Sequence, residues 1–341
     1  MRRSTRLGLA IVVALLVLSG AYTGFWFYAA SHVEDGLGQG VAALHAQQVA
    51  ASWHSIRVGG FPFAFDVELR EARLSDHAGI PGVEIRAPRL RGTARPWNPR
   101  IWRVAAPDGL SATTTAPGKP AVTLKAQTAT GSVAIGAEGG ARVWVGLAAF
   151  TADGGAHLAA RDVDAWFSLP SHPPRTHTEP AFGVALAAHE VTLPMMPAAF
   201  SKPLDELALG ATVRGAIPAA PAREAATAWR DSGGTLELDH FTLHWGALAI
   251  TGSGTVALDA QLQPIAAFSA EVEGYPELIG ALVAAGHIPA GEARLARLGL
   301  ALLSHTGADG RPQLKTSFRI QNGKMYLGPA KLGPAPHIAW P

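Results

Sequence analysis

The sequence predicts a mainly β protein with a few helices: an N-terminal transmembrane helix, then a large curved antiparallel sheet, with two helices and a β-hairpin near the C-terminus. Three observations lead to this fold class. Apolar and polar residues alternate in stretch after stretch of the chain. The composition is 48% hydrophobic and 16% charged, with 38 Gly and 25 Pro to bound the strands. Finally, one long uncharged segment lies at the N-terminus.

This uncharged segment, residues 7–30, is long enough for a helix to cross a bilayer core. Residues 1–6 would form a cytoplasmic tail, because Arg2, Arg3 and Arg6 stay inside. The sequence therefore predicts a single-pass inner-membrane protein with most of its chain in the periplasm. Cleavage of a signal peptide after Ser19-Gly20-Ala21 is the competing interpretation. The far membrane interface would hold Phe25, Trp26, Phe27 and Tyr28.

Charge and cysteine content exclude several classes of function. Without the three arginines of the tail, 25 basic residues balance 26 acidic ones, so there is no electrostatic case for nucleic-acid binding. The chain has no cysteine, which excludes disulfides, thiolate metal sites and cysteine nucleophiles. The absence of thiols also fits an oxidising compartment.

After the anchor, residues 31–52 are expected to form a short helical connector, and residues 53–215 a β-rich domain. The first stretch of that domain, "GGFPFAFDVELREARL", alternates apolar and polar residues, as a two-faced strand does. Few helical patterns are available to cover this region, so the sheet is expected to curve into an open half-barrel or groove. The face predicted to contact lipid or the core consists of Phe61, Phe63, Phe65, Val67 and Leu69.

The C-terminal part begins after residues 216–234, which read either as a helical linker or as a covering insertion. Residues 235–341 are predicted to be β-rich, with helices at 275–286 and 290–305. A terminal hairpin is expected to turn at Asn322-Gly323, because this pair favours a two-residue turn.

The histidines suggest no catalytic or metal centre. His172 and His177 lie with Glu179 in a proline-rich loop, without the ligand spacing of a known zinc site. His240 and His244 share a strand face but stand about 13 Å apart, too far for one metal. No nucleophile elbow or P-loop is present, so we predict no catalytic, cofactor-binding or metal-binding residues and expect no enzymatic activity.

The segment "RPWNPR" and the residues just after it place two tryptophans close to several arginines. Trp97 and Trp102, together with Arg95, Arg100 and Arg103, have the composition of a membrane-interface contact. A packed aromatic corner with solvated arginines is the alternative. Asn98-Pro99 favours a turn in either case.

Together, "GGFPFAFDV", "RPWNPR" and the closing "IQNGKMYLGPAKLGPAP" resemble the family called domain of unknown function 2125. This resemblance covers nearly the whole chain and implies no established activity. In organisation alone, an anchor followed by a long sheet and a terminal hairpin is similar to the AsmA and TamB envelope proteins. That similarity implies a curved sheet whose apolar inner face conducts lipid.

These observations lead to one expected function and one alternative. We expect the apolar sheet face to bind or conduct lipid in envelope maintenance, with the inner membrane and phospholipid as partners. The alternative is a scaffolding protein with a closed β core and envelope proteins as partners. No cofactor and no nucleic-acid partner is expected.

Overall fold

The structure is a computed structural model that describes residues 2–46, 49–76, 82–115, 120–193, 202–284, 289–306, 312–328 and 330–340. The chain divides into two compact units, Met1–Ala134 and Ile135–Pro341. The prediction of a mainly β chain with antiparallel pairing and short C-terminal helices is confirmed.

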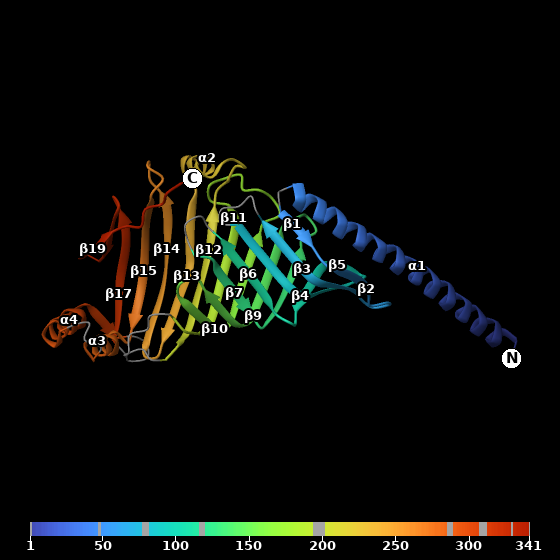
Figure 1. Ribbon diagram of the computed structural model, residues 1–341, viewed down its shortest axis with the longest axis horizontal. Coiled ribbons are helices and arrows are strands. Elements are labelled where there is room, and N and C mark those ends of the chain that lie inside the picture. Colours follow the sequence, from blue (N-terminus) through green and yellow to red (C-terminus); the bar gives the residue numbers. More distant parts are fainter. Residues whose placement is uncertain are drawn as a thin grey trace. The chain divides into compact units, whose positions relative to one another are not determined.

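Unit 1 begins with helix α1, which runs without a break from Arg2 to Ala46 (Figure 1). The expected anchor at 7–30 and most of the expected connector at 31–52 thus belong to one helix. Side chains of α1 are described only from Leu18 onward, so those of residues 7–17 lie outside the description. None of the helices, as far as residues are described, meets the length and apolarity expected of a membrane span.

Eight strands follow in the described part of unit 1, and the pairings between them are antiparallel. β1 and β2 pair with successive parts of β3, whose other edge pairs with β4. β5 and β6 in turn pair with successive parts of β4, β8 pairs with β5, and β7 pairs with β6. The bounds are β1 (Val49–Ser52), β2 (Ser55–Gly59), β3 (Phe65–Asp76), β4 (Gly82–Arg95), β5 (Asn98–Ala106), β6 (Leu110–Thr115), β7 (Val122–Ala126) and β8 (Thr128–Ile135).

Irregularities in these strands line up from one strand to the next. Glu71 has a left-handed φ of 51°, and the β3–β4 pairing skips Glu71 and Pro88 while the register on either side stays the same. β4 pairs with β6 up to Arg86 and with β5 again only from Arg91. Such irregularities interrupt the hydrogen-bond ladder locally. Their alignment opens the sheet between β4 and the junction of β5 with β6.

An ion pair crosses β3 and β4 in unit 1. Arg91 Nε donates a hydrogen bond to Asp66 Oδ1 at 2.7 Å, and this bond lowers the pKa of Asp66. Because the folded-state pKa is the lower one, the pair stabilises the fold above the ordinary Asp pKa of about 3.9. The stabilisation is then lost as the pH falls through the folded-state pKa.

We therefore expect Arg91→Gln to lower the free energy of unfolding by about 0.5 kcal/mol at neutral pH, the usual size for an exposed pair. The difference from wild type shrinks as the pH falls through the pKa of Asp66. Urea unfolding at several pH values measures it. A loss of the same size at every pH would show that the ion pair is not its cause.

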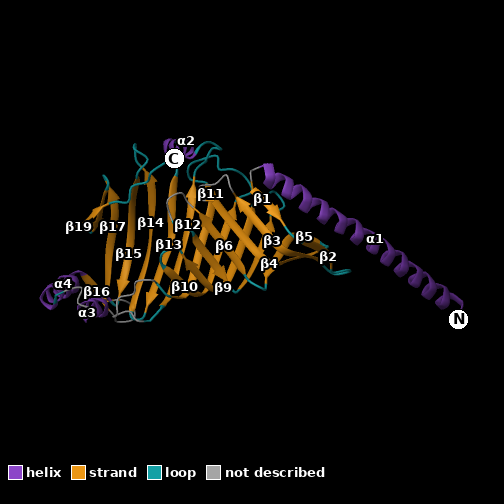
Figure 2. Ribbon diagram, in the orientation of Figure 1, coloured by secondary structure: helices purple, strands orange, loops and turns teal. Residues whose placement is uncertain are grey.

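Unit 2 is a run of antiparallel strands in which each strand mostly pairs with the next along the chain (Figure 2). The strands are β9 (Ala141–Asp153), β10 (His157–Leu169), β11 (Pro180–Val191), β12 (Leu204–Arg214), β13 (Thr235–Trp245), β14 (Leu248–Leu258), β15 (Pro264–Glu273), β16 (Ser304–Thr306), β17 (Pro312–Gln321), β18 (Lys324–Leu327) and β19 (Ala330–Pro334). The helices are α2 (Ala222–Asp231), α3 (Tyr275–Ala284) and α4 (Ala290–Leu303).

Two connections in unit 2 can be compared with the predictions from the sequence. Residues 216–234 contain α2 and join β12 to β13, which pair with each other, so this segment connects neighbouring strands of one sheet. The terminal hairpin turns where it was expected: Asn322 and Gly323 have φ angles of 53° and 66°. Both angles lie in the left-handed region that such a two-residue turn requires.

Candidate functional site

In the sheet of unit 2, large apolar side chains of neighbouring strands line up on one face. Residues directly opposite one another in neighbouring strands point to the same face. Leu186 faces Leu209, and Leu209 faces Phe241. The same register continues through Ile250 opposite Val272. One face is therefore apolar from strand to strand.

We call this surface the apolar face of unit 2. Its strand-to-strand continuity follows from the pairings of β9 through β18. Its larger members are Val143, Val145, Leu147, Val163, Phe167, Val184, Leu186, Leu207, Leu209, Leu236, Leu238, Phe241, Leu243, Ile250, Val256, Phe268, Val272, Leu314, Phe318, Ile320, Met325 and Leu327.

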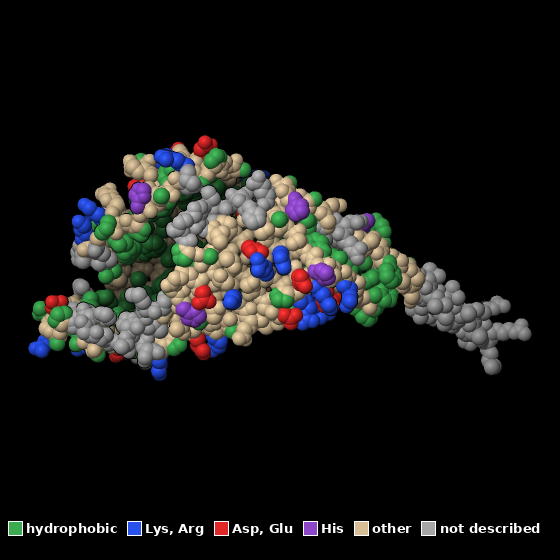
Figure 3. All heavy atoms as spheres, viewed as in Figure 1, with side chains coloured by type: hydrophobic (Ala, Val, Ile, Leu, Met, Phe, Trp, Pro, Cys, Tyr) green, Lys and Arg blue, Asp and Glu red, His purple; other side chains and the backbone are tan. Residues whose placement is uncertain are grey.

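Within the described residues, helices cover this face only at its ends. Tyr275 and Ile279 of α3 pack with Ala293 of α4 against Val272 and Leu314 at one end of their strands. Helix α2 lies at the other end, where the Trp229 indole donates to the carbonyl oxygen of Arg214 at 2.7 Å. Between the helices, hydrophobic side chains line a hollow over β14, β15 and β17 (Figure 3).

The middle of the apolar face remains half-buried. Phe268 and Phe318 lie with ring centroids 5.9 Å apart, yet both keep part of their surface open. No large side chain is completely buried in the described part of the chain, and more than half of its buried hydrophobic residues are alanines. A closed core buries most of its Leu, Val and Phe side chains. This face is therefore open along its middle, as a ligand-binding surface is.

On β14, β15 and β17 the opposite face of unit 2 carries small polar and charged side chains. Ser253, Ser269 and Ser317 lie directly opposite one another on β14, β15 and β17. Beside them, Lys315 Nζ lies 2.9 Å from Glu271 Oε1, and the hydrogen bond from Lys315 lowers the pKa of Glu271. These serines and the ion pair identify the face opposite the apolar one as the face that water solvates.

The predicted aromatic face of residues 59–74 proves to have two parts. β3 starts at Phe65, because Phe61 and Phe63 belong to a turn that contains a cis peptide bond at Pro62. The prediction of one continuous strand from residue 59 was wrong for this reason: the alternation was accidental where proline sets the backbone. From Phe65 onward, Val67 and Leu69 alternate with polar residues as expected.

Helix α1 accounts for part of this aromatic set. Phe65 is only 2% exposed and packs against Trp26 and Ala30 of α1. Phe61 is 47% exposed and contacts the Trp26 ring edge to face at 5.4 Å. Phe63 is 71% exposed. Thus Phe65 belongs to a local core, while Phe63 is free to meet solvent or a partner.

The aromatic residues predicted for the membrane interface also separate into two groups. Trp26 is buried, and its indole donates to the carbonyl oxygen of Ala64 at 3.2 Å. Trp102 is half-buried and packs against the same cluster. Phe25, Phe27, Tyr28 and Trp97 are exposed, the last with the Arg95 guanidinium 5.9 Å from its ring centroid. The alternation of Trp102 with Val104 and Ala106 was a sequence signal for its inward orientation.

His189 and His244 lie on either side of Glu206, directly opposite it on the two neighbouring strands. His244 Nδ1 lies 3.1 Å from Glu206 Oε2, and His189 Nδ1 lies 2.5 Å from Asp162 Oδ2. His172 contacts Ser171. Within the described residues, no three His, Cys, Asp or Glu side chains form a group that fits a metal ion.

Residues 26–336 match the family DUF2125, described as an uncharacterized protein conserved in bacteria. The chain belongs to this family. The match begins inside α1 at Trp26, the residue that packs on Phe65, and includes both units. No curated protein and no solved structure matches the chain.

Proposed function

We propose that this DUF2125 protein binds the acyl chains of lipid on the apolar face of unit 2. The observation that carries the proposal is the half-buried state of this face between α2 and the α3–α4 pair. Each fully buried Leu, Val or Phe side chain gains about 1.5–3 kcal/mol over its exposed state, and an acyl chain supplies such cover without polar groups of its own. A series of such side chains across many strands gives a long surface, suited to holding or conducting an extended chain.

The location we propose follows from the N-terminus. Residues 7–30 are uncharged and follow three arginines, so we place them as a single inner-membrane anchor with the sheet-rich units in the periplasm. Exposed Phe25, Phe27 and Tyr28 suit the membrane interface on that side. Trp26 packs on Phe65 at the start of β3 and so ties the proposed anchor to the sheet of unit 1. This contact would keep unit 1 close to the membrane surface.

The alternative of a scaffold with a closed β core receives less support. A closed core requires a second layer over the apolar face, whereas the described helices of unit 2 reach only the strand ends. We also propose no catalytic role. The polar face bears serines, threonines and paired ions, without the base, nucleophile and orienting group of a hydrolytic centre.

Mass spectrometry of lipids extracted from the purified protein tests the proposal. We expect the full chain in mild detergent, and a secreted variant that lacks residues 2–17, to carry phospholipid in comparable molar ratio. The truncation keeps Trp26 and Ala30, which pack on Phe65. Lipid on the full chain alone would assign it to the anchor, and absence of lipid from both proteins would refute the proposal.

A further inference from the structure

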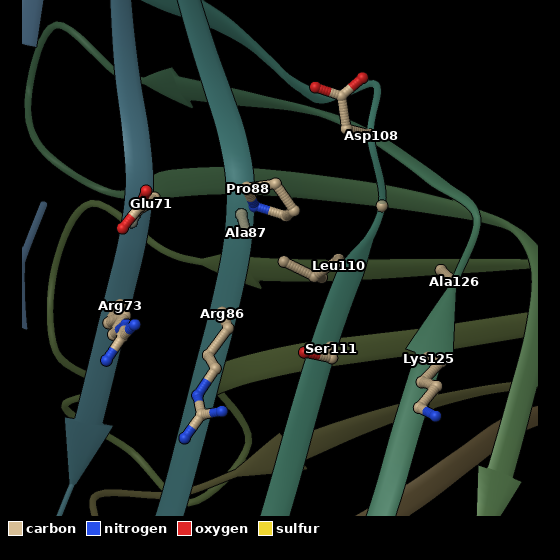
Figure 4. A pocket seen from close by; sticks show the side chains of 12 residues that line it. Glu71, Arg73, Arg86, Ala87, Pro88, Asp108, Leu110, Ser111, Lys125 and Ala126 are labelled. Atoms are coloured by element: carbon tan, nitrogen blue, oxygen red, sulfur yellow. The ribbon is translucent and has the colours of Figure 1, made fainter. Parts of the chain in front are cut away.

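The gap between β4 and the β5–β6 junction in unit 1 forms a pocket of about 440 Å³. Four polar residues lie at one level along it, on neighbouring strands (Figure 4). Arg73 of β3 faces Arg86 of β4, Arg86 faces Ser111 of β6, and Ser111 faces Lys125 of β7. We call Arg73, Arg86, Ser111 and Lys125 the basic row.

The charges in the basic row are poorly compensated. Arg73 and Arg86 stand directly opposite each other, an arrangement of like charges that destabilises a sheet. Arg86 has a carboxylate partner in Glu84, with its Nε 2.7 Å from Glu84 Oε1. Within the described structure, Arg73 and Lys125 have no ion-pair partner. A bound anion would remove this repulsion.

Two carboxylates also line the pocket, and neither neutralises the row. Asp108 forms an ion pair with Arg89, whose Nη2 donates a hydrogen bond to Asp108 Oδ1 at 2.9 Å. Glu71 is exposed, at the position that the β3–β4 pairing skips and beyond the level of Arg73 (Figure 4). Its carboxylate makes no ion pair among the described residues. Because Arg86 is paired with Glu84, the row keeps two uncompensated cations, Arg73 and Lys125, beside the Ser111 hydroxyl.

From this geometry we infer that the pocket binds a phosphoryl group carried by a small organic molecule. Guanidinium forks match phosphate oxygens in pairs, and a lysine ammonium adds a compact charge. The Arg73 guanidinium, the Lys125 ammonium and the Ser111 hydroxyl offer more donors than the two oxygens of a carboxylate can accept. The pocket falls within the range of small-molecule sites, and Pro88 and Leu110 supply apolar contact for the organic part.

This site is independent of the proposed lipid surface. The basic row alternates along its strands with the apolar side chains Leu74, Ile85 and Leu124, so it belongs to the other face of the sheet. The pocket residues all lie in unit 1, whereas the proposed acyl-chain surface lies in unit 2. Loss of lipid binding would therefore leave the phosphoryl site intact.

Calorimetric titration of the full chain with inorganic phosphate and glycerol 3-phosphate, at low ionic strength, tests the inference. We expect binding with one site per chain and a Kd raised about tenfold by Arg73→Gln or Lys125→Gln, since each variant removes a charge-assisted hydrogen bond. Lys125→Arg should restore most of the affinity. Both positions are exposed, so folding is expected to survive, and circular dichroism checks it.

Arg57→Gln and Arg103→Gln are the matched controls. Both remove one exposed arginine from the polar face of unit 1 outside the pocket, and we expect Kd to change about twofold or less. Failure of both probes to bind, or an equal loss in the controls and the pocket variants, would overturn the inference.

A third probe identifies the source of the phosphoryl group. Dihexanoylphosphatidylglycerol, used below its micelle concentration, is titrated into wild type and Arg73→Gln. Tighter binding than glycerol 3-phosphate that Arg73→Gln abolishes indicates a lipid headgroup. Similar affinity for the two probes indicates a soluble phosphate ester. Binding of this lipid that Arg73→Gln leaves unchanged counts against the pocket as its site.

Discussion

The double variant Phe167→Asp/Val184→Asp is expected to lose at least about tenfold of its bound phospholipid. The two side chains are directly opposite on β10 and β11, and each is 38% exposed on the apolar face of unit 2. Burial of two ionised carboxylates under an acyl chain costs several kcal/mol, whereas hydrated carboxylates at these open positions leave the backbone pairing intact. Mass spectrometry of lipid extracts, normalised to protein, measures the loss.

The same two strands offer a matched control. Trp166 and Ala185 are the next opposite pair, and they point to the other face of the sheet. Trp166 is 43% exposed, close to the value for Phe167. The variant Trp166→Asp/Ala185→Asp is expected to retain its lipid. Equal lipid content in both double variants would exclude the apolar face of unit 2 as the binding surface.

The second large effect is expected from Phe65→Ala, which should lower the free energy of unfolding by about 3–5 kcal/mol. Phe65 is enclosed by Trp26 at a centroid distance of 5.6 Å, by Ala30 and by Trp102, so truncation leaves a cavity beneath α1. Chemical denaturation of the full chain, followed by tryptophan fluorescence, measures the change.

Phe63→Ala is the control for this variant, because Phe63 lies two residues away and is mostly exposed. We expect its effect to stay within about 0.5 kcal/mol. If the two phenylalanines had equal effects on stability, the packing of α1 on β3 would not be what stabilises this region.

Much of the fold was accessible from periodicity, because a strand in a two-faced sheet must alternate. Leu314, Thr316, Phe318 and Ile320 alternate with polar residues, and Asn322-Gly323 allows few turns other than the one observed. The α3 and α4 helices also follow from their apolar spacing and bounding residues. Strand alternation, turn residues and helix ends depend on a few neighbouring residues, so a single sequence is enough to predict them.

The candidate sites were less accessible. Phe61, Phe63 and Phe65 look equivalent in the sequence, yet a turn, a helix contact and a strand register give them three different environments. The basic row was not anticipated at all, since Arg73, Arg86, Ser111 and Lys125 meet only through the pairing of four strands. A charge pattern within each strand gave no signal of these neighbours.

By itself, the sequence determined that this chain is mainly β, that its strands have one apolar side, and that its end forms a tight hairpin. Those properties depend on side-chain period and turn chemistry, which are local. Only the tertiary structure decided which apolar side chains are covered, which stay open along unit 2, and which cations gather at the gap in unit 1. These outcomes depend on strand register and on where the helices pack, and both are set by contacts between residues far apart in the chain.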